Sequence, residues 1–129
     1  MSDGAPQKPY HLTLEQRPGY LYAYVEGEHD SYEISKAYWQ EIANEVARRG
    51  VDRVLIDENI EETVSIAEIY ELASQIPFMG FISTRVAFVD RYLEHHEVNS
   101  FAELVAVNRG MRGKVFNDLE SAERWLLAD

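Results

Sequence analysis

Residues 54–58 read Val-Leu-Ile-Asp-Glu, and this stretch decides the fold class. Its three consecutive apolar residues are typical of a central strand that is covered on both faces. A similar run, Val86-Ala87-Phe88-Val89, follows further along the chain. A helical pattern lies between the two runs, and strand–helix–strand order predicts parallel strands joined by right-handed crossovers.

Upstream of this stretch, the segments 11–15 and 20–25 alternate between the two faces of a strand, and Pro18-Gly19 marks a turn between them. Val115-Phe116 indicates a short last strand. Four helices are expected, each opened by a capping box with a glutamate three residues later; they begin at Asp30, Ser65, Ser100 and Asn117. The pattern predicts an α/β fold with a mixed five-stranded sheet, an N-terminal hairpin followed by parallel β-α units, and four helices.

Crossovers that all step in one direction place every helix on one side of the sheet. The other face is then open, and the row Tyr20, Tyr22 and Tyr24 is expected to line it. Aromatic residues are enriched at protein interfaces, so these three tyrosines are candidate interface residues.

The chain has 129 residues, which predicts a single domain over residues 10–129 behind a disordered lead-in over residues 1–9. It has no cysteine, which excludes disulfides and thiolate metal sites. No secretory signal and no run of about 18 apolar residues is present, so we expect a cytoplasmic protein without membrane insertion.

The formal net charge is −11, which disfavours nucleic acid as a partner. Residues 26–33 and 57–71 together hold ten acidic residues and no Lys or Arg. Both segments follow strands, so they belong to the carboxyl edge of the sheet, where open α/β sheets bind ligands. The structural alternative to a binding site is that these acidic residues complement the positive N-terminal ends of the helix dipoles.

Asp57, Glu58 and Asp90 are the candidate ligand residues at this acidic edge, because clustered carboxylates suit a hard cation or acid–base chemistry. Their spacing matches no metal motif, and the loop after Asp57 is expected to be solvated. At the opposite edge, Arg109 and Arg112 are candidate contacts for an anion. The structural alternative for Arg109-Gly110 is a helix end with a left-handed glycine.

A family resemblance is clearest in the C-terminal part of the chain. This part runs from Phe101 through Asn108-Arg109-Gly110 and Val115-Phe116 to a final helix with Ala122 and Trp125-Leu126. It resembles small bacterial SpoIIAA-like (STAS-like) proteins, over roughly residues 10–128. The resemblance implies the sheet-and-helix fold of anti-anti-sigma factors, which bind a partner kinase and are switched by phosphorylation of a serine.

Ser65 is the position that matches this serine. The Asp-Ser-Ser/Thr-Gly motif of the switching proteins is absent here, since the chain reads Thr63-Val64-Ser65-Ile66-Ala67. A phosphate would also meet repulsion from neighbouring glutamates, so a plain helix cap is the favoured interpretation of Ser65.

The sequence therefore predicts a non-catalytic binding or regulatory module of SpoIIAA-like type, without a cofactor, that contacts another protein or a second copy of itself. Two alternatives remain open. One is a metal-dependent enzyme at the acidic edge, and the other is a small lipid-binding protein, because similar proteins are described as Sec14-like.

Overall fold

The structure is a computed structural model that describes residues 8–128. Residues 1–7, most of the expected lead-in, and residue 129 lie outside the described residues. Along the chain the elements are β1 (His11–Arg17), β2 (Tyr20–Glu26), α1 (Tyr32–Arg49), β3 (Arg53–Asn59), α2 (Ile66–Gln75), the 3-10 helix η1 (Ile76–Met79), β4 (Arg85–Asp90), the 3-10 helix η2 (Leu93–His95), α3 (His96–Asn108), β5 (Arg112–Phe116) and α4 (Leu119–Leu127).

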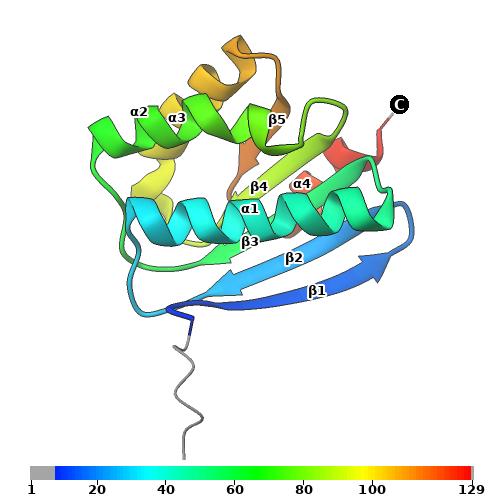
Figure 1. Ribbon diagram of the computed structural model, residues 1–129, viewed down its shortest axis with the longest axis horizontal. Helices are drawn as coiled ribbons and strands as arrows, with labels where there is room; N and C mark the ends of the chain where they lie inside the picture. The colour runs from blue at the N-terminus through cyan, green and yellow to red at the C-terminus, as the bar shows by residue number, and fades with distance from the viewer. Residues whose placement is uncertain (1–7, 129) are drawn as a thin grey trace, which may run out of the picture.

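The five strands form one mixed sheet in the order β1-β2-β3-β4-β5 (Figure 1). β1 and β2 pair antiparallel as a hairpin, and β2 to β5 run parallel. The predicted α/β class, mixed sheet and helix order are confirmed. Because parallel strands end at the same edge, the last residues of β3 and β4 meet, and Glu58 lies opposite Asp90.

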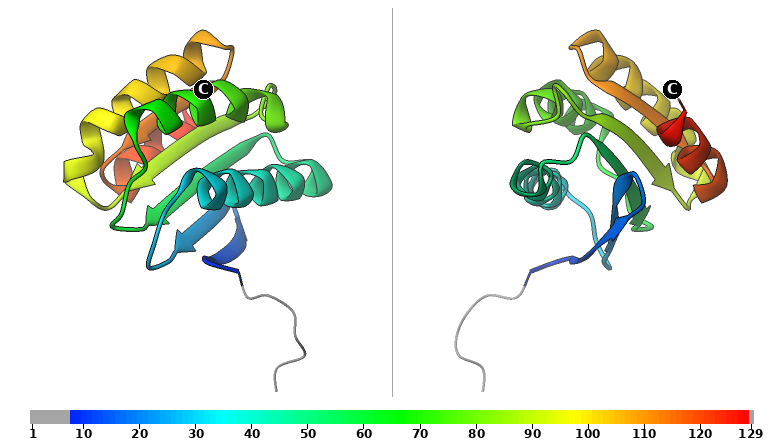
Figure 2. Two further views of the ribbon diagram at one scale, coloured as in Figure 1. Left: turned by 60° about the vertical axis from the view of Figure 1, so that its left-hand side comes forward. Right: turned by 90° about the vertical axis from the view of Figure 1, so that its right-hand side faces the viewer.

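Two layers of helices enclose the sheet. α1 and α2 lie on one side and α4 lies on the other (Figure 2). α3 packs against α2 and joins the first layer, where Ala106 is part of the core. The expectation that all helices lie on one side is therefore wrong for α4. This helix follows the edge strand β5 and has no further strand to reach, so it folds back over β3 and β4 on the opposite face.

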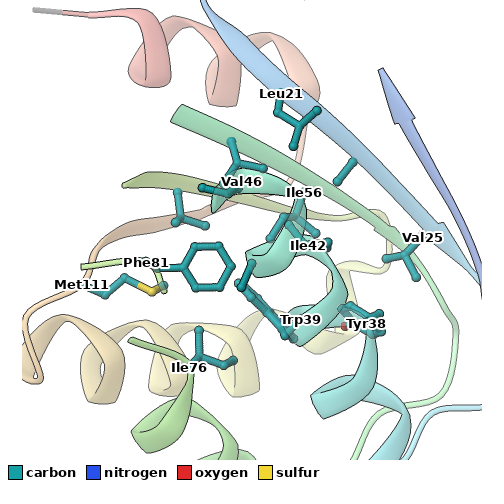
Figure 3. Close-up of a cluster of buried hydrophobic side chains, with 14 of the residues drawn as sticks. Leu21, Val25, Tyr38, Trp39, Ile42, Val46, Ile56, Ile76, Phe81 and Met111 are labelled. Atoms are coloured by element: carbon teal, nitrogen blue, oxygen red, sulfur yellow. The ribbon is translucent and has the colours of Figure 1, made fainter. Parts of the chain in front are cut away.

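The larger core lies between the sheet and α1, and Figure 3 shows its side chains. Tyr38, Ile42 and Val46 recur at helical spacing along α1 and are all buried. Trp39 also points into this core, where its ring makes an edge contact with Phe81 at a centroid distance of 5.6 Å. These positions form one apolar stripe, as expected for a helix packed on a sheet.

The helix starts agree with the capping signals to within one residue, except for α3. Ser65 is the N-cap of α2 and makes both hydrogen bonds of the expected capping box with its glutamate. α1 and α4 begin one residue later than expected, since Ser31 and Asp118 act as N-caps in place of Asp30 and Asn117. The side chains of Ser31 and Asp118 accept hydrogen bonds from backbone N–H groups of the first helical turn, which have no partner within the helix.

α3 begins four residues before the expected N-cap, Ser100, which lies inside the helix. The short helix η2 leads directly into His96, so the turn after β4 is helical from Leu93 onward. Within residues 8–128, no helix combines the length and the apolar composition that crossing a membrane requires.

Candidate functional site

A cavity of about 80 Å³ lies between the sheet and the helices α1, α2 and α3. Its floor consists of Val86, Phe88 and Val115 on β4 and β5, and Trp39 of α1 forms one wall. Phe88 stacks on the Trp39 ring at a centroid distance of 5.7 Å. Although Phe88 belongs to a central strand and faces the helices, it is only half-buried, because the helices do not close over it.

Small residues keep this space open. Ala73 of α2 and Ala102 and Ala106 of α3 line the cavity, and Gly113 of β5 lies at its floor. A Cβ atom at Gly113 would approach Cε of Met111 to 2.8 Å, so a larger residue would displace the side chain of Met111, which also lines the cavity. The chamber is mainly apolar, and polar groups gather at the end where β3 and β4 stop.

Glu58 and Asp90 form the centre of this polar end. They are register partners on neighbouring strands, and their side chains are 5% and 2% exposed. The hydroxyl of Tyr38, from α1, donates a hydrogen bond to Glu58 Oε2. Asp30, which precedes α1, also lines the cavity and accepts a hydrogen bond from the Ser35 hydroxyl at 2.7 Å.

Three donors hold the Asp90 carboxylate, two from the turn after β4 and one from the first turns of α3. The backbone N–H of Tyr92 binds Oδ1 at 2.9 Å, and the side-chain amide of Asn99 binds Oδ2 at 2.9 Å. His95 Nδ1 lies 2.9 Å from the same Oδ2. These three contacts fix the orientation of the Asp90 carboxyl group.

His95 uses both ring nitrogens within the protein. Its Nε2 lies 2.7 Å from the carbonyl oxygen of Glu61, and because a carbonyl only accepts, Nε2 carries a proton. A second proton then lies between Nδ1 and Asp90. Glu58, Asp90 and His95 each offer a ligand atom within 4.8 Å of the others, a spacing that suits a metal ion. In this arrangement, however, the imidazole has no free lone pair, so the trio acts as a hydrogen-bond network.

Burial sets the protonation of the groups around the cavity. It raises the pKa of Glu58 well above the ordinary value of 4.5, and the charge of Asp90 raises it further. Burial beside Asp90 therefore favours the neutral form of the Glu58 carboxyl group. Burial also raises the pKa of Tyr38, with a further contribution from Glu58, and burial raises the pKa of Asp30.

Asp57 lies apart from this network. Consecutive strand residues point to opposite faces, so Asp57 faces the α4 side while Glu58 faces the cavity. The guanidinium of Arg91 donates two hydrogen bonds to the fully buried Asp57, at 3.2 and 2.9 Å, and the Tyr22 hydroxyl donates a third at 2.5 Å. The structure thus brings together two of the three acidic-edge candidates. Glu58 is buried, although the loop after Asp57 was expected to be solvated.

The three tyrosines of β2 do not form one open row. Tyr20 is 2% exposed, because it lies beneath α4 and donates a hydrogen bond to Glu123 at 2.6 Å. Tyr22 and Tyr24 are half-buried. The guanidinium of Arg17 lies 3.8 Å from the centre of the Tyr22 ring, so an arginine covers this part of the face.

The remaining candidates occupy local structural positions. Ser65 is exposed and its hydroxyl accepts the hydrogen bond from the Glu68 amide at 3.2 Å. Arg109 ends α3 and donates to the Tyr70 hydroxyl at 3.1 Å, with Gly110 after it at φ 98°. Arg112 reaches a backbone carbonyl, that of Ser83, at 3.4 Å.

Sequence reasoning missed Tyr38, His95 and Asn99 as members of the buried network. His95 lies in the turn after β4 and is 5% exposed. A usable signal was present: His95 and Asn99 follow a strand-ending aspartate and are four residues apart, the spacing that puts two side chains on one side of a helical turn. No family model matches this chain, and no curated protein matches it.

Proposed function

We propose that this chain is a non-catalytic binding module of SpoIIAA-like type whose ligand is a small molecule with an apolar body and a polar end. The cavity carries this proposal, since it combines a mainly apolar lining with polar groups converging at one end. Pockets of this composition, with titratable groups of perturbed pKa, are the preferred binding sites of proteins.

Binding is favoured over catalysis because the polar groups already bind each other. Within residues 8–128, no buried side-chain polar atom lacks a hydrogen-bond partner. Asp90 accepts hydrogen bonds from three donors, and both ring nitrogens of His95 are hydrogen-bonded within the protein. A nucleophile or general base must instead reach the reacting atom of a substrate.

The size of the cavity favours a small ligand over a lipid. An apolar cavity of about 150 Å³ holds one benzene molecule, so about 80 Å³ encloses less than that. A phospholipid chain would have to extend into solvent or displace α2 or α3. The Sec14-like alternative therefore requires a movement of the helices that the small-ligand proposal does not.

A fragment screen followed by backbone amide NMR tests the proposal. Bound fragments should shift the amide signals of Leu72, Phe88 and Ala106. The substitution Ala102→Leu fills the cavity from its half-buried wall and should abolish these shifts, whereas Ala47→Leu, on the exposed face of α1, should leave them unchanged. Shifts confined to the outer surface, or retained in Ala102→Leu, would overturn the proposal.

Protein contact is a second candidate function, and exposed apolar side chains on the outer face of the α2–α3 layer favour it. Ile66 and Tyr70 of α2 are 56% and 48% exposed, and Leu104 and Val107 of α3 are 59% and 44% exposed. A partner protein or a second copy would bury them. Sedimentation velocity over a concentration series tests self-association. A sedimentation coefficient that rises with concentration in the wild type, but not in Ile66→Ser/Leu104→Ser, would support contact through this face, and a constant monomer value would exclude the second copy.

A further inference from the structure

We infer that the cavity selects an amine with a short apolar body over an alcohol or a carboxylate of the same size. This inference rests on the proposed small-ligand function and specifies the chemistry of the ligand. Its basis is the balance of hydrogen-bond donors and acceptors, and of charges, at the polar end of the cavity.

Acceptors are in surplus at the polar end. The carboxylates of Asp30 and Asp90 offer about eight lone-pair sites, and Glu58, whose neutral form is favoured, adds further acceptor sites and one O–H donor. They receive hydrogen bonds from six donors: Ser31 N, Ser35 Oγ, Tyr38 Oη, Tyr92 N, His95 Nδ1 and Asn99 Nδ2. The hydroxyl donors of Ser35 and Tyr38 are thereby used within the protein. A ligand that donates hydrogen bonds therefore fits this end better than one that accepts them.

Asp30 holds acceptor capacity of its own. Both hydrogen bonds that it receives from residues 8–128 fall on Oδ1, from the Ser31 amide at 2.8 Å and the Ser35 hydroxyl at 2.7 Å. Oδ2 therefore remains available to a donor. An ammonium group supplies three N–H donors and a positive charge, and hydrogen bonds between charged groups are about twice as strong as neutral ones.

The charges that line the cavity are also uneven. Asp30, Glu58, Asp90 and Glu103 line it, and Lys114 is the one basic residue among the lining residues. The Lys114 ammonium lies 5.9 Å from the ring centre of Phe116, which packs with α4 on the opposite face of the sheet. Its positive charge is therefore directed away from the chamber. An anionic head group would meet carboxyl groups, and the ring N–H groups of the nearby His95 are already bound to Asp90 and to the carbonyl oxygen of Glu61.

Titration calorimetry of the full chain with n-butylamine, n-butanol and sodium butyrate tests the inference. The three probes share a four-carbon body and differ in the polar end. Butylamine should bind about tenfold more tightly than butanol, and butyrate should bind most weakly. Equal or weaker binding of butylamine relative to butanol overturns the inference and leaves the proposed function intact. Absence of binding by all three probes overturns the proposed function itself.

Two variants separate a specific contact from the general attraction of an acidic protein for cations. Asp30→Asn and Glu28→Gln each remove one negative charge, but Glu28 is exposed and does not line the cavity. Asp30→Asn should reduce the preference for butylamine over butanol to threefold or less, and Glu28→Gln should retain the tenfold preference. An equal loss in both variants refutes a contact with Asp30. Amide NMR spectra of each variant confirm the native fold before titration.

Discussion

Replacing Glu58 with glutamine changes how the stability of the protein depends on pH. In the folded protein Glu58 is buried beside Asp90, which raises its pKa well above 4.5, the ordinary value that it recovers on unfolding. Between pH 4.5 and the raised pKa of the folded state, the folded protein therefore binds more protons than the unfolded protein at this site. Stability falls with rising pH wherever the folded state binds more protons, here by about 1.4 kcal/mol per pH unit.

Glutamine cannot lose this proton, so Glu58→Gln lacks this contribution. Between pH 5.5 and pH 7.5, the free energy of unfolding of the variant should rise relative to the wild type, by up to about 3 kcal/mol, the limit for a carboxyl group that stays protonated in the folded state throughout. The amide also preserves the local contacts, because its oxygen accepts from Tyr38 and its N–H groups face Asp90. Titrating groups that do not interact with Glu58 contribute equally to both proteins and cancel in the difference.

Urea unfolding followed by circular dichroism at pH 5.5, 6.5 and 7.5 measures this difference. Glu61→Gln is the matched control, since Glu61 is exposed and contacts His95 only through its backbone carbonyl. The stability of the control relative to the wild type should not change with pH. A Glu58→Gln difference that is equally flat would refute the neutral carboxyl and, with it, the protonation scheme of the cavity end.

Three further substitutions test other parts of the structure by urea unfolding. Arg91→Met leaves the buried Asp57 with one hydrogen-bond donor and should lower the free energy of unfolding by about 1.5 kcal/mol. This value is at the lower end of the range for charged hydrogen bonds because Arg91 is 46% exposed. The control Arg124→Met removes an exposed ion pair and should cost less than about 0.5 kcal/mol, so equal losses in the two variants would contradict this assignment. Ser65→Ala removes the N-cap of α2 and should cost about 1 kcal/mol, and a loss below about 0.3 kcal/mol would argue against the capping role. Gly50→Ala should cost about 1 kcal/mol through backbone strain at φ 67° alone, because no atom lies within 4 Å of the added Cβ, and an unchanged stability would refute that origin.

The positions of the strands along the chain could be predicted from local patterns, because each strand carries its own sequence signal. The apolar runs of β3 and β4 and the alternation of β2 specify strands without reference to the rest of the chain. The side of the sheet chosen by α4 is different, since it depends on which face the first three helices leave uncovered. That is a property of the assembled sheet, and α4 is amphipathic enough to cover either face.

The candidate site was predicted only in part. Asp57 and Asp90 were identified because both were expected to end neighbouring strands, and Glu58 was grouped with them as the next residue along the chain. Strand alternation places Glu58, and not Asp57, on the same face of the sheet as Asp90. His95 and Asn99 became members only because the turn after β4 is helical, and this depends on the hydrogen bonds that they themselves make with Asp90.

The position of α4 has a consequence for folding during synthesis. Chains fold from the N-terminus as they are made. The core under α1 can form once β5 has emerged, but the opposite face waits for residues 119–127, which supply Ala122 and Leu126. Until then the nascent sheet presents Tyr20, Leu55, Ala87 and Val89 to solvent. A translational pause before residue 119 would thus expose a bare apolar sheet face, the surface that chaperones recognise and that unfinished chains use to aggregate.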